Sequence, residues 1–234
     1  MGKPMKPSNS GGKAREKAPE GRHNFRLLHI VQLGTVRDKT FKYDKGPQKG
    51  QFVKKNEVKL YFELVDTAHV FDEAKGPQPF MLNKTFTFSL GEKANMRKFF
   101  EQWRGKKYTD EEINEKFDLT AYWKFPGELQ VAHETAKDGK VYANISVVMP
   151  ISPGTKEARA KIKKLQNTPI LFRLDDEETY PEFANLYKWD QERIKESEEW
   201  KEVGKKVLAV CPEEEEGSDE GEGEAADDGE DAPY

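Results

Sequence analysis

The stretch from Thr85 to Lys107 constrains the fold most, because the spacing of its apolar residues changes from that of a strand to that of a helix. Apolar and polar residues alternate between 85 and 90, which is typical of a half-buried strand. A stripe at helical spacing follows, made by Met96, Phe99, Phe100 and Trp103. We predict a strand, a turn with a capping box formed by Ser89 and Glu92, and an amphipathic helix that ends before Gly105.

Two strands are expected before this stretch and two after it. A first apolar strand covers 25–36, with Gly34 at a bulge or bend, and a second alternates over 58–65. A second small helix is expected after a capping box at 109–112. The last two strands, 128–134 and 140–149, form a hairpin around Asp138-Gly139. The core side of the fifth strand is expected to carry Val141, Ala143, Ile145, Val147 and Met149.

This order of elements indicates a mainly β fold with α-helix. Three strands, a helix and two strands are the order of a five-stranded OB-fold barrel, in which a helix lies between strands 3 and 4. C-terminal elaborations are expected after it: a charged segment over 156–166, a strand over 170–174 and an outer helix over 183–200. We therefore predict a disordered basic arm at 1–22, the OB-fold domain with its extension at 23–203, and a disordered acidic tail at 204–234.

Charge divides the chain into a basic body and an acidic end. The last 22 residues, from Glu213, hold 12 acidic and no basic residues, which leaves 39 basic and 31 acidic residues in the rest. A basic body favours polyanionic partners, whereas the acidic end imitates a polyanion or simply keeps the chain soluble. One cysteine forms no internal disulfide, and no apolar run approaches the ~20 residues of a membrane span. We expect a soluble intracellular protein without membrane contact.

The most basic segment, 37–55, is a candidate site for single-stranded nucleic acid. It has seven Lys or Arg against two Asp, with aromatic residues set among them. Cations bind phosphates, and aromatic rings stack on any base. The candidates in this segment are Arg37, Lys39, Phe41, Lys42, Tyr43, Lys45, Lys49, Phe52, Lys54 and Lys55. The outer face of strand two and neighbouring loops or strands are expected to add Lys59, Tyr61, Lys84, Lys137, Lys140 and Tyr142.

Catalytic and metal sites find little support in the sequence. The carboxylates of 175–178 would suit a divalent metal, as in a nuclease, but such a run is more often a solvated turn. Residues 91–93 lack the glycine spacing of a phosphate-binding loop. We expect a non-enzymatic protein without catalytic residues, metal or cofactor. A metal-dependent DNA-processing enzyme remains an alternative, and so does an adaptor whose tail mimics DNA.

The chain ends on an aromatic residue after its acidic run. An acidic segment with a terminal hydrophobe and a free carboxylate suits a basic pocket of a partner. Bacterial single-stranded DNA-binding proteins end in a similar run that closes on Asp-Ile-Pro-Phe, and Asp231-Ala232-Pro233-Tyr234 resembles it. The residues expected to contact a partner are Glu230, Asp231, Pro233 and Tyr234.

The body also resembles the OB-fold single-stranded DNA-binding proteins of tailed bacteriophages, from about Phe25 to Trp200. The matching residues are Ser89-Leu90-Gly91-Glu92-Lys93-Ala94-Asn95-Met96-Arg97-Lys98, Trp103-Arg104-Gly105, Thr109-Asp110-Glu111-Glu112, Phe117-Asp118-Leu119, Tyr142-Ala143-Asn144-Ile145 and Ile194-Lys195-Glu196-Ser197-Glu198-Glu199-Trp200. The resemblance implies an OB fold and binding of single-stranded DNA with little sequence preference. It also implies an acidic C-terminus that contacts replication or recombination proteins, in the cytoplasm of a bacterial host. The oligomeric state stays unknown.

Overall fold

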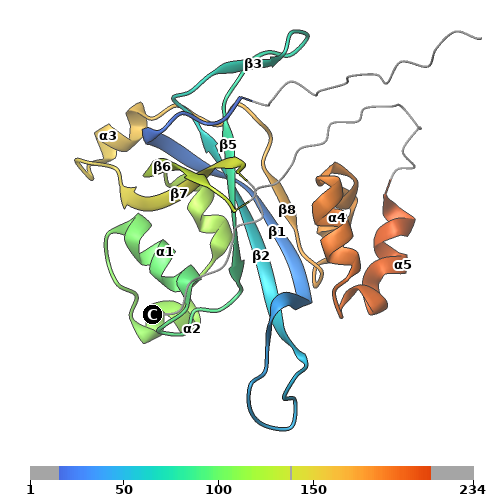
Figure 1. Cartoon of the computed structure of the whole chain (residues 1–234). Helices are drawn as coiled ribbons and strands as arrows, with labels where there is room; N and C mark the ends of the chain where they lie inside the picture. The colour runs from blue at the N-terminus through green and yellow to red at the C-terminus, as the bar shows by residue number, and fades with distance from the viewer. Residues whose placement is uncertain (1–15, 138, 212–234) are drawn as a thin grey trace, which may run out of the picture.

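A six-stranded, largely antiparallel sheet organises the computed structural model, which describes residues 16–137 and 139–211. The fold is mixed α/β, with helices on both sides of the sheet (Figure 1). The main strands are β1 (Gly21–Lys42), β2 (Phe52–Leu64), β5 (Met81–Thr87), β6 (Gly127–Thr135) and β7 (Val141–Pro150). Their order in the sheet is β5-β2-β1-β6-β7. A short strand, β8 (Ile170–Phe172), pairs in parallel with β1, and β3 (His69–Asp72) with β4 (Gly76–Gln78) forms a separate ribbon.

The sheet is open between its two edge strands. No strand pairing joins β5 to β7 among the residues that the structure describes. Helix α1 (Asn95–Arg104) follows β5 in the chain and contacts both edge strands. The predicted helix between the third and fourth main strands is therefore present, but the closed barrel is not observed.

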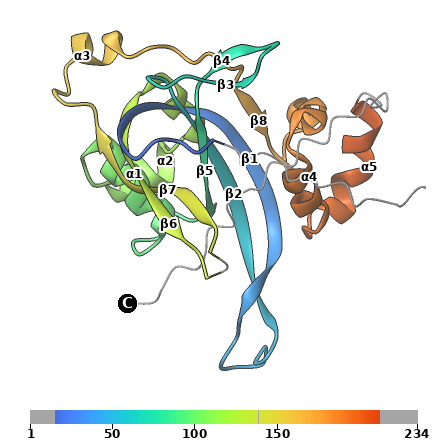
Figure 2. The ribbon, with the colours of Figure 1, turned by 45° about the horizontal axis from the view of Figure 1, so that its top comes forward.

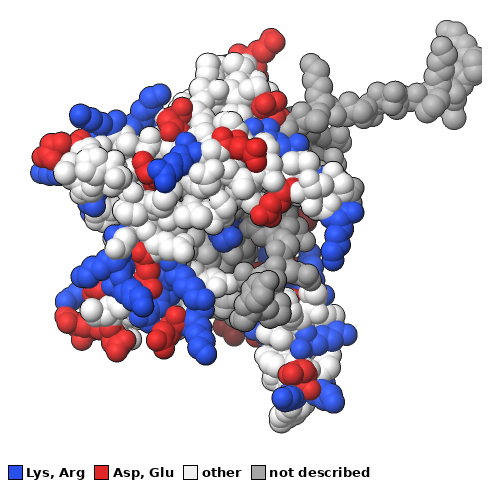
Figure 3. Space-filling model, turned by 60° about the vertical axis from the view of Figure 1, so that its left-hand side comes forward, with Lys and Arg blue, Asp and Glu red and all other residues white. Residues whose placement is uncertain are grey.

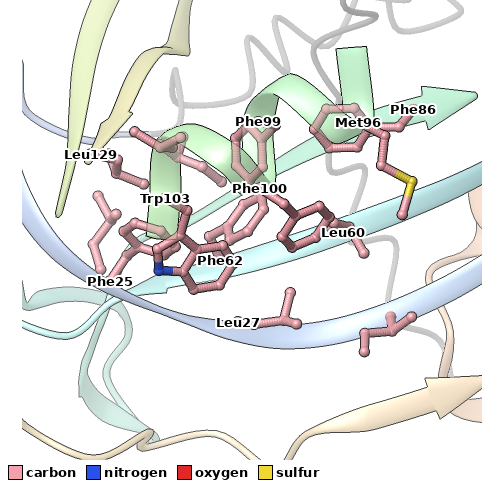
Figure 4. Packing of buried hydrophobic residues seen from close by; sticks show 14 of the residues in the cluster. Phe25, Leu27, Leu60, Phe62, Phe86, Met96, Phe99, Phe100, Trp103 and Leu129 are labelled. Atoms are coloured by element: carbon pink, nitrogen blue, oxygen red, sulfur yellow. The ribbon is translucent and has the colours of Figure 1, made fainter. Parts of the chain in front are cut away.

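The α1 helix is built around the stripe seen in the sequence. Met96, Phe99, Phe100 and Trp103 are all buried. They pack against the sheet through side chains of β1, β2, β5 and β6, which include Phe25, Leu27, Leu60, Phe62, Phe86 and Leu129 (Figure 4). The helix ends at Gly105, which adopts the left-handed conformation with φ 70°. This part of the prediction is confirmed.

The start of α1 differs from the prediction. The N-cap is Ala94, which makes no side-chain capping bond, so the expected box of Ser89 and Glu92 does not form. The Ser89 hydroxyl instead accepts the Gly91 N–H at 3.3 Å, inside the loop before the helix. β5 ends at Thr87, and Phe88 lies in that loop with 45% of its surface exposed. The expected box at Thr109 and Glu112 does form, and it starts α2 (Asp110–Glu115).

The β6–β7 hairpin carries a bulge that changes which side chains face the core. The register shifts between Gln130 and Val131, which pair with Val147 and Ile145. The extra residue on β7 reverses the alternation beyond it. Val148 is buried and Val147 is exposed, so the expected inward position of Val147 is wrong.

A C-terminal layer covers the sheet face opposite α1. It comprises η2 (Glu177–Asn185), α4 (Lys188–Lys195) and α5 (Trp200–Val210), whereas α3 (Lys156–Lys161) lies elsewhere (Figure 2). The single helix expected over 183–200 is thus divided: the extended chain at Leu186 and Tyr187 separates η2 from α4, and α5 begins only at Trp200. A second apolar cluster joins this layer to β1, and it includes Leu28, Val31, Phe172, Phe183, Ile194 and Val207.

Both ends of the folded body lie outside the predicted domain limits of 23 and 203. β1 begins at Gly21, and Ala18 before it is buried. At the other end α5 continues to Val210, and its Val207 is fully buried. The regular structure therefore extends further at both ends than the sequence suggested. A three-ten helix, η1 (Leu119–Lys124), completes the elements.

Candidate nucleic-acid interface

The basic segment 37–55 forms a two-stranded ribbon that projects from the sheet (Figures 1 and 2). Arg37 pairs with Lys54, and Lys42 pairs with Phe52, with a register shift between the two pairs. At the tip, the Tyr43 N–H donates to the Gln51 carbonyl at 2.9 Å, and the Gly50 N–H donates back to the Tyr43 carbonyl at 2.8 Å. Backbone hydrogen bonds therefore hold this ribbon together beyond the body of the protein.

The ribbon exposes two aromatic rings, each beside an ammonium group. Phe41 is 41% exposed and Phe52 is 38% exposed. Lys55 Nζ lies 5.1 Å from the centroid of the Phe41 ring, and Lys42 Nζ lies 4.6 Å from that of Phe52. Aromatic rings beside cations are the combination that single-stranded nucleic acid requires, because bases stack on the rings and phosphates bind the cations. Tyr43 is half-buried at the tip.

Most of the ribbon's basic side chains form no ion pair with the residues that the structure describes. Lys55 pairs with Asp38 at 2.7 Å, and Lys54 pairs with Glu198. Burial alone raises the pKa of Asp38, but the hydrogen bonds from Lys55 and two backbone N–H groups lower it overall. Among the described residues no ion pair involves Arg37, Lys39, Lys42, Lys45 or Lys49. Figure 3 shows Lys and Arg side chains on the ribbon and, on the same face, over α1 and α2.

Lys59 and Tyr61 do not lie on an exposed face, contrary to the prediction. Both are buried, because α4 covers this part of β2. The Lys59 ammonium lies 3.1 Å from the Asp190 carboxylate, which also accepts the Tyr61 hydroxyl. Burial raises the pKa of Asp190 in spite of the attraction of Lys59. These side chains attach the C-terminal layer to the sheet and are not available to a nucleic acid.

The remaining predicted contacts are not part of the ribbon. Lys84 is half-buried on the same face of β5 as Leu82 and Phe86, which is the face that packs against α1. Lys137, Lys140 and Tyr142 belong to the β6–β7 hairpin. β6 pairs with the N-terminal end of β1, whereas the ribbon continues from its C-terminal end. The tail candidates Glu230, Asp231, Pro233 and Tyr234 lie outside the described residues.

The carboxylates of 175–178 make local contacts instead of a metal site. Arg173 pairs with Asp175 at 2.8 Å and with Asp176 at 3.8 Å, and Asp176 caps η2. Within 16–137 and 139–211, no group of three or more His, Cys, Asp or Glu side chains is placed to hold a metal ion.

Sequence reasoning missed an aromatic pocket on the α1 side of the sheet. It lies between α1, α2, η1 and the end of β7, and its volume is about 370 Å³. Phe125 received no role in the sequence-based prediction. The available signal was the aromatic content of 117–125, which follows neither strand nor helix spacing. The lining includes Trp103, Arg104, Tyr108, Phe117, Tyr122, Phe125 and Arg159.

Comparison with known proteins adds no relative. No protein family, curated protein or solved structure matches the chain. In the part of the chain that the structure describes, the helices are all too short or too polar to cross a membrane.

Proposed function

We propose that this protein is a bacteriophage single-stranded DNA-binding protein. It coats and protects single strands during replication or recombination with little sequence preference, in the cytoplasm of the bacterial host. Its acidic C-terminal tail regulates DNA binding and recruits replication or recombination proteins. The observation that carries the proposal is the projecting ribbon, in which exposed Phe41 and Phe52 lie among seven basic residues, five of which form no ion pair with the described residues.

The chemistry of the ribbon favours single strands over duplexes. Lys and Arg attract phosphates of any sequence, and ring stacking requires a base whose face is free. Bases in a duplex are already stacked on each other, so Phe41 and Phe52 gain little from a double strand. Stacking and charge together explain affinity without reading base edges, which accounts for little sequence preference.

The strand order also supports an OB-type architecture. With α1 between β5 and β6, the main strands follow the OB-fold order, opened between the third and fifth strands. OB folds bind oligonucleotides with the connections between strands 1 and 2 and between strands 4 and 5. Here those connections are the ribbon and the β6–β7 turn with Lys137 and Lys140. The resemblance to phage proteins over 25–200 points to the same function.

Two sets of ribbon variants test the proposal. Phe41→Ala and Phe52→Ala each lower the affinity for a labelled single strand at least about fivefold, since base stacking contributes about 1 to 3 kcal/mol per base. The double variant Lys39→Glu and Lys45→Glu lowers the affinity for the strand further and reduces the salt dependence of that affinity. The controls are Phe71→Ala on β3 and Lys201→Glu with Lys205→Glu on α5, which change exposed side chains away from the ribbon.

Unchanged affinity in the ribbon variants would contradict the proposal. A second arm of the experiment incubates the labelled strand with the protein and Mg²⁺. The strand keeps its full length if the protein only binds, whereas shorter products would favour the DNA-processing enzyme.

A further inference from the structure

The aromatic pocket beside α1 has the construction of a ligand site. Its volume of about 370 Å³ lies within the range of known small-molecule sites. The lining comes from α1, α2, η1, the end of β7 and α3, with the loops beside them, and its aromatic rings are those of Trp103, Tyr108, Phe117, Tyr122 and Phe125. Such a pocket, apolar with a few convergent polar groups, is a usual place for ligand binding.

The pocket's inner walls are fixed by packing. The Tyr122 ring lies 4.4 Å from Phe100 and 4.9 Å from Trp103, measured between ring centroids. The Tyr108 and Tyr122 hydroxyls are hydrogen-bonded to each other. By contrast, Phe125 is 46% exposed, with its centroid 6.4 Å from that of Tyr122. A ligand would therefore meet rigid inner rings and one exposed outer ring.

The charges at the pocket are only partly neutralised, and the lining contains the carboxylate of Asp118, which accepts hydrogen bonds from Thr120, as well as basic side chains. Arg104 lies 4.3 Å from the Tyr108 ring centroid and pairs with Glu112 at 2.7 Å. This hydrogen bond, with that of the Thr109 N–H, holds the pKa of Glu112 at about 2. Lys116 pairs with Glu111 outside the lining. Arg159 on α3 is exposed and forms no ion pair in the described part of the chain. The unneutralised cation at the pocket is therefore a guanidinium, a group that suits phosphate.

We infer that this pocket receives one unstacked base of the bound single strand, with the adjoining phosphate on Arg159. The inference rests on the proposed function and extends it to a second contact point, separate from the ribbon. A flat base fits between aromatic walls, and Arg159 matches the charge of its phosphate. Lys and Arg side chains, with Asp and Glu among them, lie over α1 and α2, which form two walls of the pocket (Figure 3).

Photocrosslinking separates this inference from the proposed function. A single strand that carries 5-iododeoxyuridine is bound to the full-length protein and irradiated, and the attached residues are mapped by mass spectrometry. The inference predicts crosslinks to Tyr122 or Phe125 as well as to the ribbon. Crosslinks to the ribbon alone would overturn the inference and leave the proposed function intact. If the strand does not bind at all, the proposed function itself fails.

Variants at the pocket mouth give an independent measurement. Phe125→Ala and Arg159→Ala both change exposed side chains, and each is expected to raise the Kd for the strand at least about fivefold. The matched controls are Leu208→Ala, an exposed apolar residue on α5, and Lys161→Ala, an exposed cation on α3 beside Arg159. Equal affinity of all four variants would overturn the inference. A competition experiment gives a further check. If an acidic peptide displaced the crosslink and mononucleotides did not, the inference would also be overturned, because the pocket would then be a peptide site.

Discussion

At the residue scale, Glu199 and Thr35 join the C-terminal layer to the bend of β1. The Thr35 N–H and hydroxyl each donate to the Glu199 carboxylate at 2.7 Å, and the Glu198 N–H donates to the Thr35 carbonyl at 3.0 Å. Gly34 beside them has φ +84°, and a Cβ there would lie 2.7 Å from Leu174 and from Ser197. Only glycine fits this bend, which explains why the sequence places one inside an apolar strand.

Glu199→Gln is expected to lower the free energy of unfolding by about 1 to 3 kcal/mol, because a charged acceptor of two hydrogen bonds is lost. Burial alone raises the pKa of Glu199, but the bonds from Thr35 lower it below 4.5 overall. Because the pKa of Glu199 is lower in the folded protein than in the unfolded chain, its ionised form stabilises the fold fully above about pH 4.5. This stabilisation is lost as the pH falls through the folded-state pKa of Glu199. Urea unfolding between pH 7 and pH 3 should therefore show the largest difference from the wild type at pH 7.

Glu202→Gln on the exposed side of α5 is the matched control, and it should unfold like the wild type. If Glu199→Gln lowered the free energy of unfolding by the same amount at pH 3 as at pH 7, the ionised carboxylate would not be the cause of the lost stability.

Single-residue burial was predictable only where it depends on local pattern. Alternation correctly put Lys59 and Tyr61 on the face of β2 opposite Leu60. Whether that face is exposed to solvent depends on its contact with α4, whose Asp190 is 131 residues from Lys59 in the chain. No local signal in the sequence joins these positions, so the buried ion pair was not foreseen.

At the scale of elements, α1 is the one that its own sequence specifies best. Four large apolar residues at helical spacing leave one face to bury, and Gly105 ends the helix. The elements around 183–200 were harder to predict, because their apolar residues keep helical spacing across Leu186, where the structure has a break. The break is set by packing against β1 and β8, which the sequence pattern does not contain.

Met96→Ala is expected to destabilise the protein by about 2 to 5 kcal/mol, since it empties a fully buried position of α1. Lys98→Ala on the exposed side of the same helix is the control, and it should change stability little. Thermal unfolding followed by circular dichroism measures both. Similar melting temperatures for the two variants would show that the stripe is not what holds α1 to the sheet.

At the scale of the whole molecule, the sequence predicted the order of strands and the basic ribbon, but not the openness of the sheet. Barrel closure requires β5 and β7 to pair, and these strands are far apart in the chain. α1 contacts both of them, but no strand pairing joins them in the part of the chain that the structure describes. The C-terminal layer was predicted as an elaboration, yet its position over β2 excludes two residues that had been assigned to DNA.

If the acidic tail regulates DNA binding as proposed, removal of 213–234 is expected to tighten the binding of single strands, because it deletes a polyanion that would compete with DNA at high effective concentration. The increase in affinity on removal of the tail should be largest at low salt, where charge interactions are least screened. Fluorescence anisotropy of a labelled strand compares the full chain with the truncated one. Equal or weaker binding by the truncated chain would refute the competition.

The central claim is that the ribbon binds single strands through phosphates and unstacked bases. Equilibrium titration of the full chain with single-stranded and double-stranded DNA of equal length, at two salt concentrations, tests it most directly. The account predicts tighter binding of the single strand. Five cations of the ribbon form no ion pair with the described residues, so the account also predicts that log K falls with log salt with a slope of about three to four. Equal affinity for both forms, or an affinity that salt does not change, would contradict it.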